Sequence, residues 1–207
     1  MVKKMAFLGG TFDPPHYGHI WLARKALQEL PVQTVRVIPN GVPPHRPQPR
    51  APWVARVVMC ELALQNVADV VVGRDEPPGS NVHWTLRTLQ RLRRRHGRAP
   101  LLIIGADSFA QFHRWRCWQR ILSLTNVVVA ARHGAVRPRS MVRMRCRVVT
   151  RSQQLIGNCG RVFFWRSGAP AVSSTNIRQR LKKRQSVTHL LPLSVLTEIQ
   201  QQELYAG

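Results

Sequence analysis

Six short apolar runs, separated by longer segments, constrain the fold of this chain most strongly. The residues within a run do not alternate between apolar and polar; the runs are 5–8, 34–38, 70–72, 101–104, 127–131 and 161–165. A strand without polar alternation is buried on both faces, which is typical of a parallel sheet covered by helices. The sequence therefore predicts a doubly wound, Rossmann-like α/β fold, whose ligands bind at the carboxyl ends of the strands.

The segments between these runs organise the rest of the chain. Apolar residues recur at helical spacing, which predicts helices over 19–30, 56–66, 84–95 and 115–124. Residues 133–160 hold six arginines and show little periodicity, so we expect a surface excursion between two strands. A length of 207 residues suits one sizeable domain. We predict a single domain over 1–207, with a helical C-terminal part over 173–207.

The charge of the chain is unusual. Lysine and arginine total 32 against nine acidic residues, which gives a formal net charge of +23. Such an excess attracts polyanions, either nucleic acid or ligands that carry phosphate. Arginine is spread along the chain, so mutational drift in base composition accounts for the surplus equally well. The sequence has no aromatic-interleaved basic motif and no helix-turn-helix signature, so we expect no specific nucleic-acid partner.

Several other classes are excluded. No uncharged stretch has the length of a membrane-spanning helix, and the first apolar run is too short for a secretory signal. The four cysteines are scattered and form no CxxC pair, which argues against a zinc site and a disulfide framework. We therefore expect a cytoplasmic protein with no membrane partner.

The segment GGTFDPPHYGH, residues 9–19, follows the first strand and opens the first helix. Glycines let backbone N–H groups approach an anion closely, and a helix N-terminus favours phosphate. His16 and His19 would project toward the same ligand and stabilise charge on phosphoryl oxygens. The pair is also compatible with a structural role or half of a metal site, although Asp13 fits a turn-capping role better than a ligand role. With its glycines and strand context included, the segment predicts a phosphate site.

The segment VSSTNIR, residues 172–178, starts a helix near the C-terminus. Ser173 or Ser174 can cap this helix, and its first N–H groups face an anion. Arg178 lies one turn further on, where its planar fork can grip a phosphate through two hydrogen bonds. A plain capped helix with a solvated arginine fits this segment as well, so the segment alone leaves both interpretations open.

Together the two segments resemble the signatures of the nucleotidyltransferase superfamily with the HxGH motif. Segments between them match as well: PNGVPPHR (39–46), Asp75-Glu76 before WTLRTL (84–89), GADS (105–108) before Trp115, and the C-terminal stretch from Leu191-Pro192. The set is similar to the bacterial nicotinate-nucleotide adenylyltransferases over nearly the whole chain except residues 133–160.

That resemblance implies transfer of the adenylyl group of ATP to nicotinate mononucleotide, which forms nicotinate adenine dinucleotide and pyrophosphate in NAD biosynthesis. It implies in-line attack without a covalent enzyme intermediate. His16 and His19 would contact the ATP phosphates, and Arg178 with Ser174 and Thr175 would hold the outgoing phosphates. The rest of the implied ATP site is Gly9, Gly10, Thr11, Phe12, Ile104, Gly105 and Asp107. Mg²⁺ is expected to bind chiefly through the nucleotide, because the chain offers no carboxylate cluster.

The resemblance also implies an acceptor site. Asn40, His45 and Arg46 would meet the mononucleotide, Trp115 would stack on its pyridine ring, and backbone amides near Thr85 and Arg116 would bind its carboxylate. Arg132 belongs to the same implied site, with its role open, and Trp115 is also compatible with a place in the core. A pocket of N–H donors prefers nicotinate to nicotinamide, whose amide carries its own donors.

Three positions depart from the family pattern: Trp84 stands where tyrosine is usual, Arg132-His133-Gly134 replaces Arg-Pro-Gly, and Arg46 replaces lysine. None lies in the two phosphate segments, so the acceptor geometry is affected more than adenylyl transfer. The alternatives are a preference for nicotinamide mononucleotide, another adenylyltransferase of the same fold, a weakly active enzyme, and a polyanion-binding protein.

Overall fold

The structure is a computed structural model, and it describes residues 4–41, 48–78, 85–131 and 146–206. Within these ranges seven strands form one sheet in the order β3-β2-β1-β4-β5-β7-β6, and all neighbouring strands are parallel. The strands are β1 (Met5–Gly10), β2 (Thr34–Pro39), β3 (Val70–Val72), β4 (Leu101–Gly105), β5 (Val127–Ala131), β6 (Arg147–Val149) and β7 (Arg161–Arg166). The predicted doubly wound α/β fold is confirmed.

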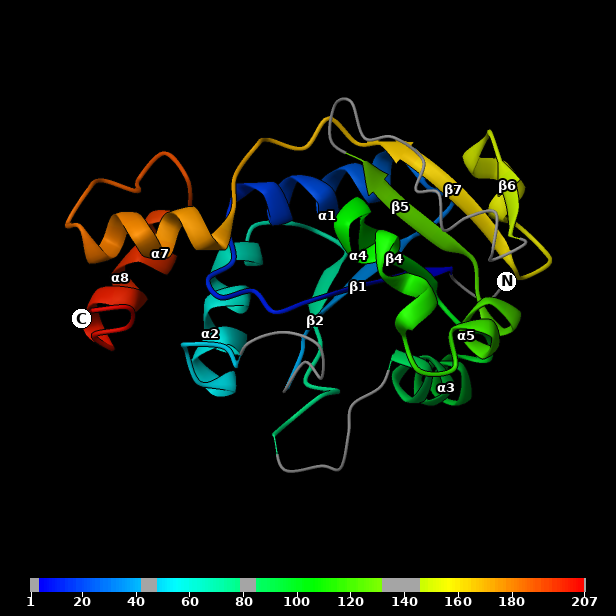
Figure 1. Cartoon of the computed structure of the whole chain (residues 1–207), viewed down its shortest axis with the longest axis horizontal. Helices are drawn as coiled ribbons and strands as arrows, with labels where there is room; N and C mark the ends of the chain where they lie inside the picture. The colour runs from blue at the N-terminus through cyan, green and yellow to red at the C-terminus, as the bar shows by residue number, and fades with distance from the viewer. Residues whose placement is uncertain (1–3, 42–47, 79–84, 132–145, 207) are drawn as a thin grey trace.

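Helices follow most of the strands. They are α1 (Tyr17–Glu29), α2 (Trp53–Leu64), α3 (Thr85–His96), α4 (Ala106–Ala110), α5 (Trp118–Leu124), α7 (Ser174–Lys182) and α8 (Leu193–Gln201), with 3-10 turns η1 (Phe112–Arg114) and η2 (Ser152–Leu155). Figure 1 shows α1 on one side of the sheet and α3 and α5 on the other.

Two hydrophobic cores, one on each face of the sheet, explain why the strands lack polar alternation. In β4, Leu101 and Ile103 enter the core beneath α1, α2 and α8. Leu102 and Ile104 enter the core beneath α3 and α5. Because successive side chains of a strand point to opposite faces, a sheet covered on both faces requires apolar residues at every position.

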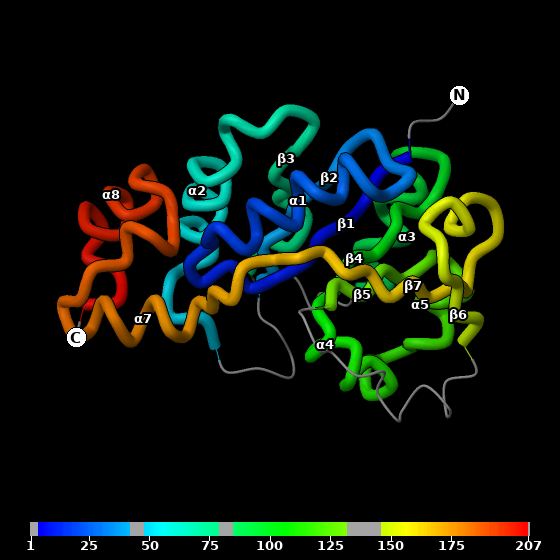
Figure 2. Tube along the Cα trace, turned by 90° about the horizontal axis from the view of Figure 1, so that it is seen from above, coloured from blue at the N-terminus to red at the C-terminus, as the bar shows by residue number. Residues whose placement is uncertain are grey.

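The C-terminal helices are part of the first core. Val195 and Ile199 of α8 are buried in the same cluster as Met59 and Cys60 of α2. Figures 1 and 2 show α7 and α8 together at one end of the molecule, with β6 at the other end. The long crossing from β7 to α7 brings the C-terminal part of the chain back beside α1.

Two sequence predictions were wrong in part. The expected excursion over 133–160 includes a seventh strand, β6, which pairs with β7 at the edge of the sheet. The expected helix over 115–124 begins only at Trp118, because Cys117, directly before it, adopts a left-handed conformation (φ 58°, ψ 34°). A short edge strand such as β6 carries a weak sequence signal, because few of its side chains are buried. A single left-handed residue such as Cys117 does not change the spacing of the apolar residues around it.

The order of the strands places the topological switch point between β1 and β4. From β1 the sheet continues to β2 and β3 on one side and to β4 and β5 on the other. At such a point the loops after the two central strands separate and leave a crevice at the carboxyl ends, where ligands of open α/β sheets bind. The loop of residues 11–16 and the start of α4 lie at this edge.

Candidate active site

The loop from β1 to α1 brings two histidines together. The backbone N–H of His16, which precedes the first turn of α1, donates to Nδ1 of His19 over 3.2 Å. The two imidazole rings stack with their centroids 3.7 Å apart. The ring of Phe12 meets His19 edge-on at 4.8 Å. His16 is buried and His19 is half-buried, so the pair is held in a fixed arrangement at the start of a helix.

Gly18 packs closely against the ring of His16. A Cβ atom at position 18 would lie 3.0 Å from the ring of His16 and 3.5 Å from the carbonyl oxygen of Pro170. The ring would have to shift by a few tenths of an ångström, whereas the contact with Pro170 is an ordinary van der Waals contact. The glycine of the His-x-Gly-His pattern therefore serves the seating of the first histidine.

The start of α7 meets this loop directly. Ser173 caps α7 by accepting a hydrogen bond from the backbone N–H of Asn176 over 3.2 Å. The hydroxyl of Ser174 donates to the carbonyl oxygen of Pro14 over 2.8 Å. Arg178 donates through Nη1 to the carbonyl oxygen of Asp13 over 2.6 Å and through Nη2 to the hydroxyl of Thr175 over 3.3 Å. Two segments about 160 residues apart thus form one cluster.

The sequence analysis favoured a turn-capping role for Asp13, but its side chain contacts other parts of the chain instead. Its buried carboxylate accepts hydrogen bonds from the backbone N–H groups of Arg50 and Ala51, over 3.0 and 3.1 Å. The hydroxyl of Tyr205, close to the C-terminus, donates to the same carboxylate over 2.7 Å. Burial, and then the negative charge of Asp13, raise the pKa of Tyr205 well above its ordinary value. Asp13 therefore joins three distant parts of the chain beneath the loop.

The end of β4 supplies the residues expected near adenosine. Ile104 is buried, whereas Gly105 and Asp107 are exposed. A Cβ at Gly105 would meet no atom within 4 Å, so the space beside this residue is open. Since β1 and β4 are parallel neighbours, Gly105 and the glycines at the end of β1 lie at the same edge of the sheet. Gly9 and Gly10 themselves are half-buried.

The residues expected for the acceptor are only partly within the described chain. Asn40 lies beside the glycines, because its N–H donates to the carbonyl oxygen of Gly10 over 2.8 Å. Thr85 begins α3, and the neighbouring α5 follows Trp115 and Arg116. Trp115 is half-buried, with its ring 5.2 Å from that of Phe112, so it takes part in the second core. The expectations for His45, Arg46, Trp84 and Arg132 fall outside the described residues.

Comparison with known proteins assigns the family. Residues 7–180 match the family described as cytidylyltransferase-like. A probable nicotinate-nucleotide adenylyltransferase of Klebsiella pneumoniae is 35% identical over 99% of this chain and 98% of its own length. One from Acidithiobacillus ferrooxidans is 35% identical over 97% and 95% of the two chains. This chain belongs to the nicotinate-nucleotide adenylyltransferase family.

Solved structures support the family's fold for this chain. The nicotinic acid mononucleotide adenylyltransferase of Plasmodium falciparum, solved with NaAD, superposes with a TM-score of 0.75 at 14% identity, over 98% of this chain and 97% of the other. A putative nicotinate-nucleotide adenylyltransferase from Vibrio parahaemolyticus gives a TM-score of 0.64 at 15% identity, over 98% and 95%. In the part of this family member that the structure describes, no helix is long and apolar enough to cross a membrane.

One residue that organises the site was missed by the sequence analysis. Arg56 of α2 is 1% exposed, and its guanidinium donates to the carbonyl oxygens of Thr11, Gly41 and Ala51, over 2.7, 3.0 and 3.2 Å. Burial lowers the pKa of Arg56, and the nearby Asp13 carboxylate opposes that shift. Its signal was a lone arginine within the apolar stretch WVARVVMCELAL. In this family member, Arg56 therefore ties the loops after β1 and β2 to α2.

Proposed function

We propose that this protein transfers the adenylyl group of ATP to nicotinate mononucleotide and releases pyrophosphate. The observation that carries the proposal is the junction between the start of α1, with His16 and His19, and the start of α7, with Arg178. Two helix N-termini and three basic side chains at one place suit a ligand with several phosphates. The choice of acceptor is supported by the names of relatives that match this chain over nearly its whole length.

The proposed reaction is a single in-line displacement. An oxygen of the acceptor's phosphate forms a bond to the α-phosphorus of ATP, and the bond from that phosphorus to the bridging oxygen of the β-phosphate breaks. Pyrophosphate leaves with the electron pair of that bond. Because the attacking oxygen is already anionic, the reaction needs no general base, and catalysis consists of positioning and charge stabilisation.

The basic side chains have distinct roles in this proposal. His16 and His19 donate hydrogen bonds to phosphoryl oxygens as charge develops there. Arg178 has five N–H donors, and two of its nitrogens contact protein oxygens in the described chain, so further donors can meet the departing pyrophosphate. Ser174 and Thr175 begin the same helix and contribute backbone N–H groups.

The remaining site residues divide between the two substrates. Gly9, Gly10, Thr11 and Phe12 contact ATP through the backbone, while Ile104 and Gly105 border adenosine and Asp107 accepts hydrogen bonds from the ribose. Asn40, Thr85, Trp115 and Arg116 contact the acceptor, together with His45, Arg46 and Arg132, which lie outside the described residues.

We propose that Mg²⁺ arrives bound to ATP and that the protein acts in the cytoplasm, where ATP is available. Among the described residues, His, Cys, Asp and Glu do not form a group of three that could hold a metal ion. An ion held by the phosphates fits that arrangement and would neutralise part of their charge.

Turnover of ATP with each mononucleotide, followed by pyrophosphate release, tests the proposed function. We expect kcat/KM with nicotinate mononucleotide to exceed that with nicotinamide mononucleotide at least tenfold. Replacement of His19 or Arg178 by alanine should lower kcat/KM by roughly 10²-fold, as removal of one preformed donor does in other enzymes. Equal rates with the two acceptors would overturn the substrate assignment, and unchanged rates in both variants would overturn the assigned site.

A further inference from the structure

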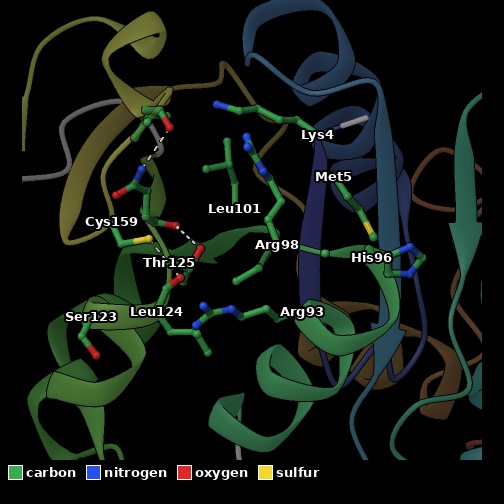
Figure 3. Close-up of a pocket in the computed structure, with 15 residues that line it drawn as sticks. Lys4, Met5, Arg93, His96, Arg98, Leu101, Ser123, Leu124, Thr125 and Cys159 are labelled. Atoms are coloured by element: carbon green, nitrogen blue, oxygen red, sulfur yellow. Dashed lines mark hydrogen bonds between the residues drawn. The ribbon is translucent and has the colours of Figure 1, made fainter. Parts of the chain in front are cut away.

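A pocket lies at the edge of the sheet opposite the candidate active site, beside the amino-terminal ends of β1 and β4. Its volume is about 340 Å³. The lining comes from the residue before β1, the end of α3, the end of α5 and the segment before β7. Figure 3 shows Lys4, Arg93 and Arg98 around it, whereas the ring of His96 points away from them, beside Met5. Since the candidate active site lies at the carboxyl ends of the strands, the two places are separated by the length of the sheet.

The charge of this pocket has one sign. Lys4, Arg93 and Arg98 line it, and none of its 15 lining residues is aspartate or glutamate. Partial burial, and then the positive charge of Arg98, lower the pKa of Lys4. The positive charges of Lys4 and Arg98 therefore repel each other at the edge of the pocket. A bound anion would remove that repulsion, because each cation would gain an opposite charge.

The arginines of α3 differ in what their side chains face. Arg91 and Arg95 turn toward Asp75, with nitrogen–oxygen distances of 3.9 and 3.8 Å to its carboxylate. Asp75 also accepts a 2.8 Å hydrogen bond from Arg36. Arg93, on another face of the same helix, lines the pocket instead. The helix thus supplies cations to an internal carboxylate and, separately, a cation to the pocket.

The pocket also offers a preformed polar wall. The side chain of Asn126 donates to the carbonyl oxygens of Leu155 and Asn158, each over 3.0 Å, and accepts from the N–H of Arg161 over 2.8 Å. These bonds fix the segment that closes one side of the pocket.

We propose that this pocket binds a small phosphorylated anion, with Lys4 and Arg98 on the phosphate oxygens. His96 also belongs to the pocket lining, so its signals can report binding. Cations without a nearby carboxylate attract such a group, and charge-assisted hydrogen bonds hold it. A volume of about 340 Å³ is near the lower limit for small-molecule sites, which favours a metabolite over a nucleic-acid strand. This binding site is independent of the proposed adenylyl transfer.

Titration with inorganic pyrophosphate, observed through the imidazole NMR signals of His96, tests the proposal. The chain has eight histidines, so comparison with His96→Gln assigns the signals. At about 150 mM salt, where nonspecific contacts are screened, we expect a saturable shift of the His96 signals. Lys4→Gln combined with Arg98→Gln should weaken binding at this site at least tenfold, since it removes both charged donors. That double variant should retain adenylyl transfer, which also reports that it is folded.

The matched control is Arg24→Gln combined with Arg166→Gln. Both arginines are exposed and lie away from the pocket lining, and the control removes the same net charge. Its affinity for pyrophosphate should stay within twofold of the wild-type value. Absence of a saturable His96 shift in the wild-type protein would overturn the proposal, as would equal weakening in the control. A short single-stranded oligonucleotide that shifts His96 where pyrophosphate does not would also overturn it, in favour of a nucleic-acid surface.

Discussion

The two edges of the sheet use arginine in opposite ways. At the carboxyl edge, the buried Arg56 donates to backbone carbonyl oxygens of the loops that surround the candidate active site. At the amino edge, Arg93 and Arg98 line a pocket without a carboxylate among its residues. Net charge alone does not distinguish these cases. The difference lies in what the guanidinium donors contact, because a cation fully engaged with carbonyl oxygens positions a loop, whereas one that faces a hollow attracts a ligand.

Arg56→Met gives the largest expected effect and tests this difference directly. The substitution leaves three carbonyl oxygens without their donor in a buried place. Each lost bond to a charged group is worth about 1.5–3 kcal/mol, partly offset by the apolar replacement, so we expect a loss of about 4 kcal/mol in the free energy of unfolding. Urea denaturation measures that loss, and kcat/KM should fall as well because the loop at Thr11 loses its anchor.

Arg98→Met is the matched variant at the amino edge. Arg98 is exposed, so we expect its replacement to change the free energy of unfolding by less than about 0.5 kcal/mol. Arg56→Lys keeps the charge but cannot reach all three oxygens, and should lie between the wild-type protein and Arg56→Met. If Arg56→Met and Arg98→Met were equally stable, the two edges would not differ in the way that we infer.

Local patterns explain how much of the architecture could be predicted from the sequence. The apolar runs and the segments between them identified six of the seven described strands, because both faces of the sheet are buried. The seventh strand, β6, buries only Val149 and exposes Arg147, so it has no apolar run to detect. The late start of α5 depends on one left-handed residue, Cys117, which leaves no trace in the helical spacing of its neighbours.

The candidate site was predictable only where its residues lie in local motifs. His16, His19 and Arg178 lie in short segments at helix starts. The first segment indicated phosphate by itself, whereas the segment with Arg178 alone was also compatible with a plain capped helix. Their meeting through Ser174 and Pro14 joins residues 160 positions apart and became visible only in the fold. Arg56 was missed because its partners Thr11 and Gly41 belong to other elements. The contact of Tyr205 with Asp13, across 192 positions, has no local pattern at all.

The next prediction concerns Glu76, a buried residue that contacts α3. Glu76 is 3% exposed and accepts a 2.5 Å hydrogen bond from the hydroxyl of Thr88 of α3. Burial raises the pKa of this carboxyl from 4.5 to about 7, although the Thr88 hydrogen bond opposes the shift. Between these two values the folded protein binds more protons than the unfolded chain. The stabilising contribution of Glu76 is therefore complete below pH 4.5 and is lost as the pH rises through 7.

Denaturation with urea at pH 5 and pH 8 measures this contribution. From the shift of about 2.5 units we expect the wild-type protein to lose on the order of 3 kcal/mol of stability through Glu76 over that range. Glu76→Gln keeps a side-chain oxygen for Thr88 and removes the titration, so its stability should depend less on pH by that amount. The same pH dependence in both proteins would show that Glu76 does not carry it. We expect Glu76→Gln to bind pyrophosphate as tightly as the wild-type protein. That result would show that the contact of Glu76 with Thr88 in α3 does not affect the pocket at the end of this helix.

The smallest effect is expected for Tyr205, a residue near the C-terminus that contacts Asp13 at the carboxyl edge of the sheet. Its hydroxyl donates to Asp13, whose carboxylate also receives the N–H groups of Arg50 and Ala51. Tyr205→Phe keeps the ring and removes one donor to a charged acceptor, so we expect a loss of about 1–2 kcal/mol in the free energy of unfolding. Since Asp13 lies in the same loop as His16, kcat/KM should fall severalfold, while pyrophosphate binding at the amino edge stays the same. Tyr17→Phe, at an exposed position, is the control and should leave the stability unchanged. A Tyr205→Phe variant as stable and as active as the wild-type protein would show that the C-terminal contact does not contribute to the loop, and that the network at the carboxyl edge ends at α2 and α7.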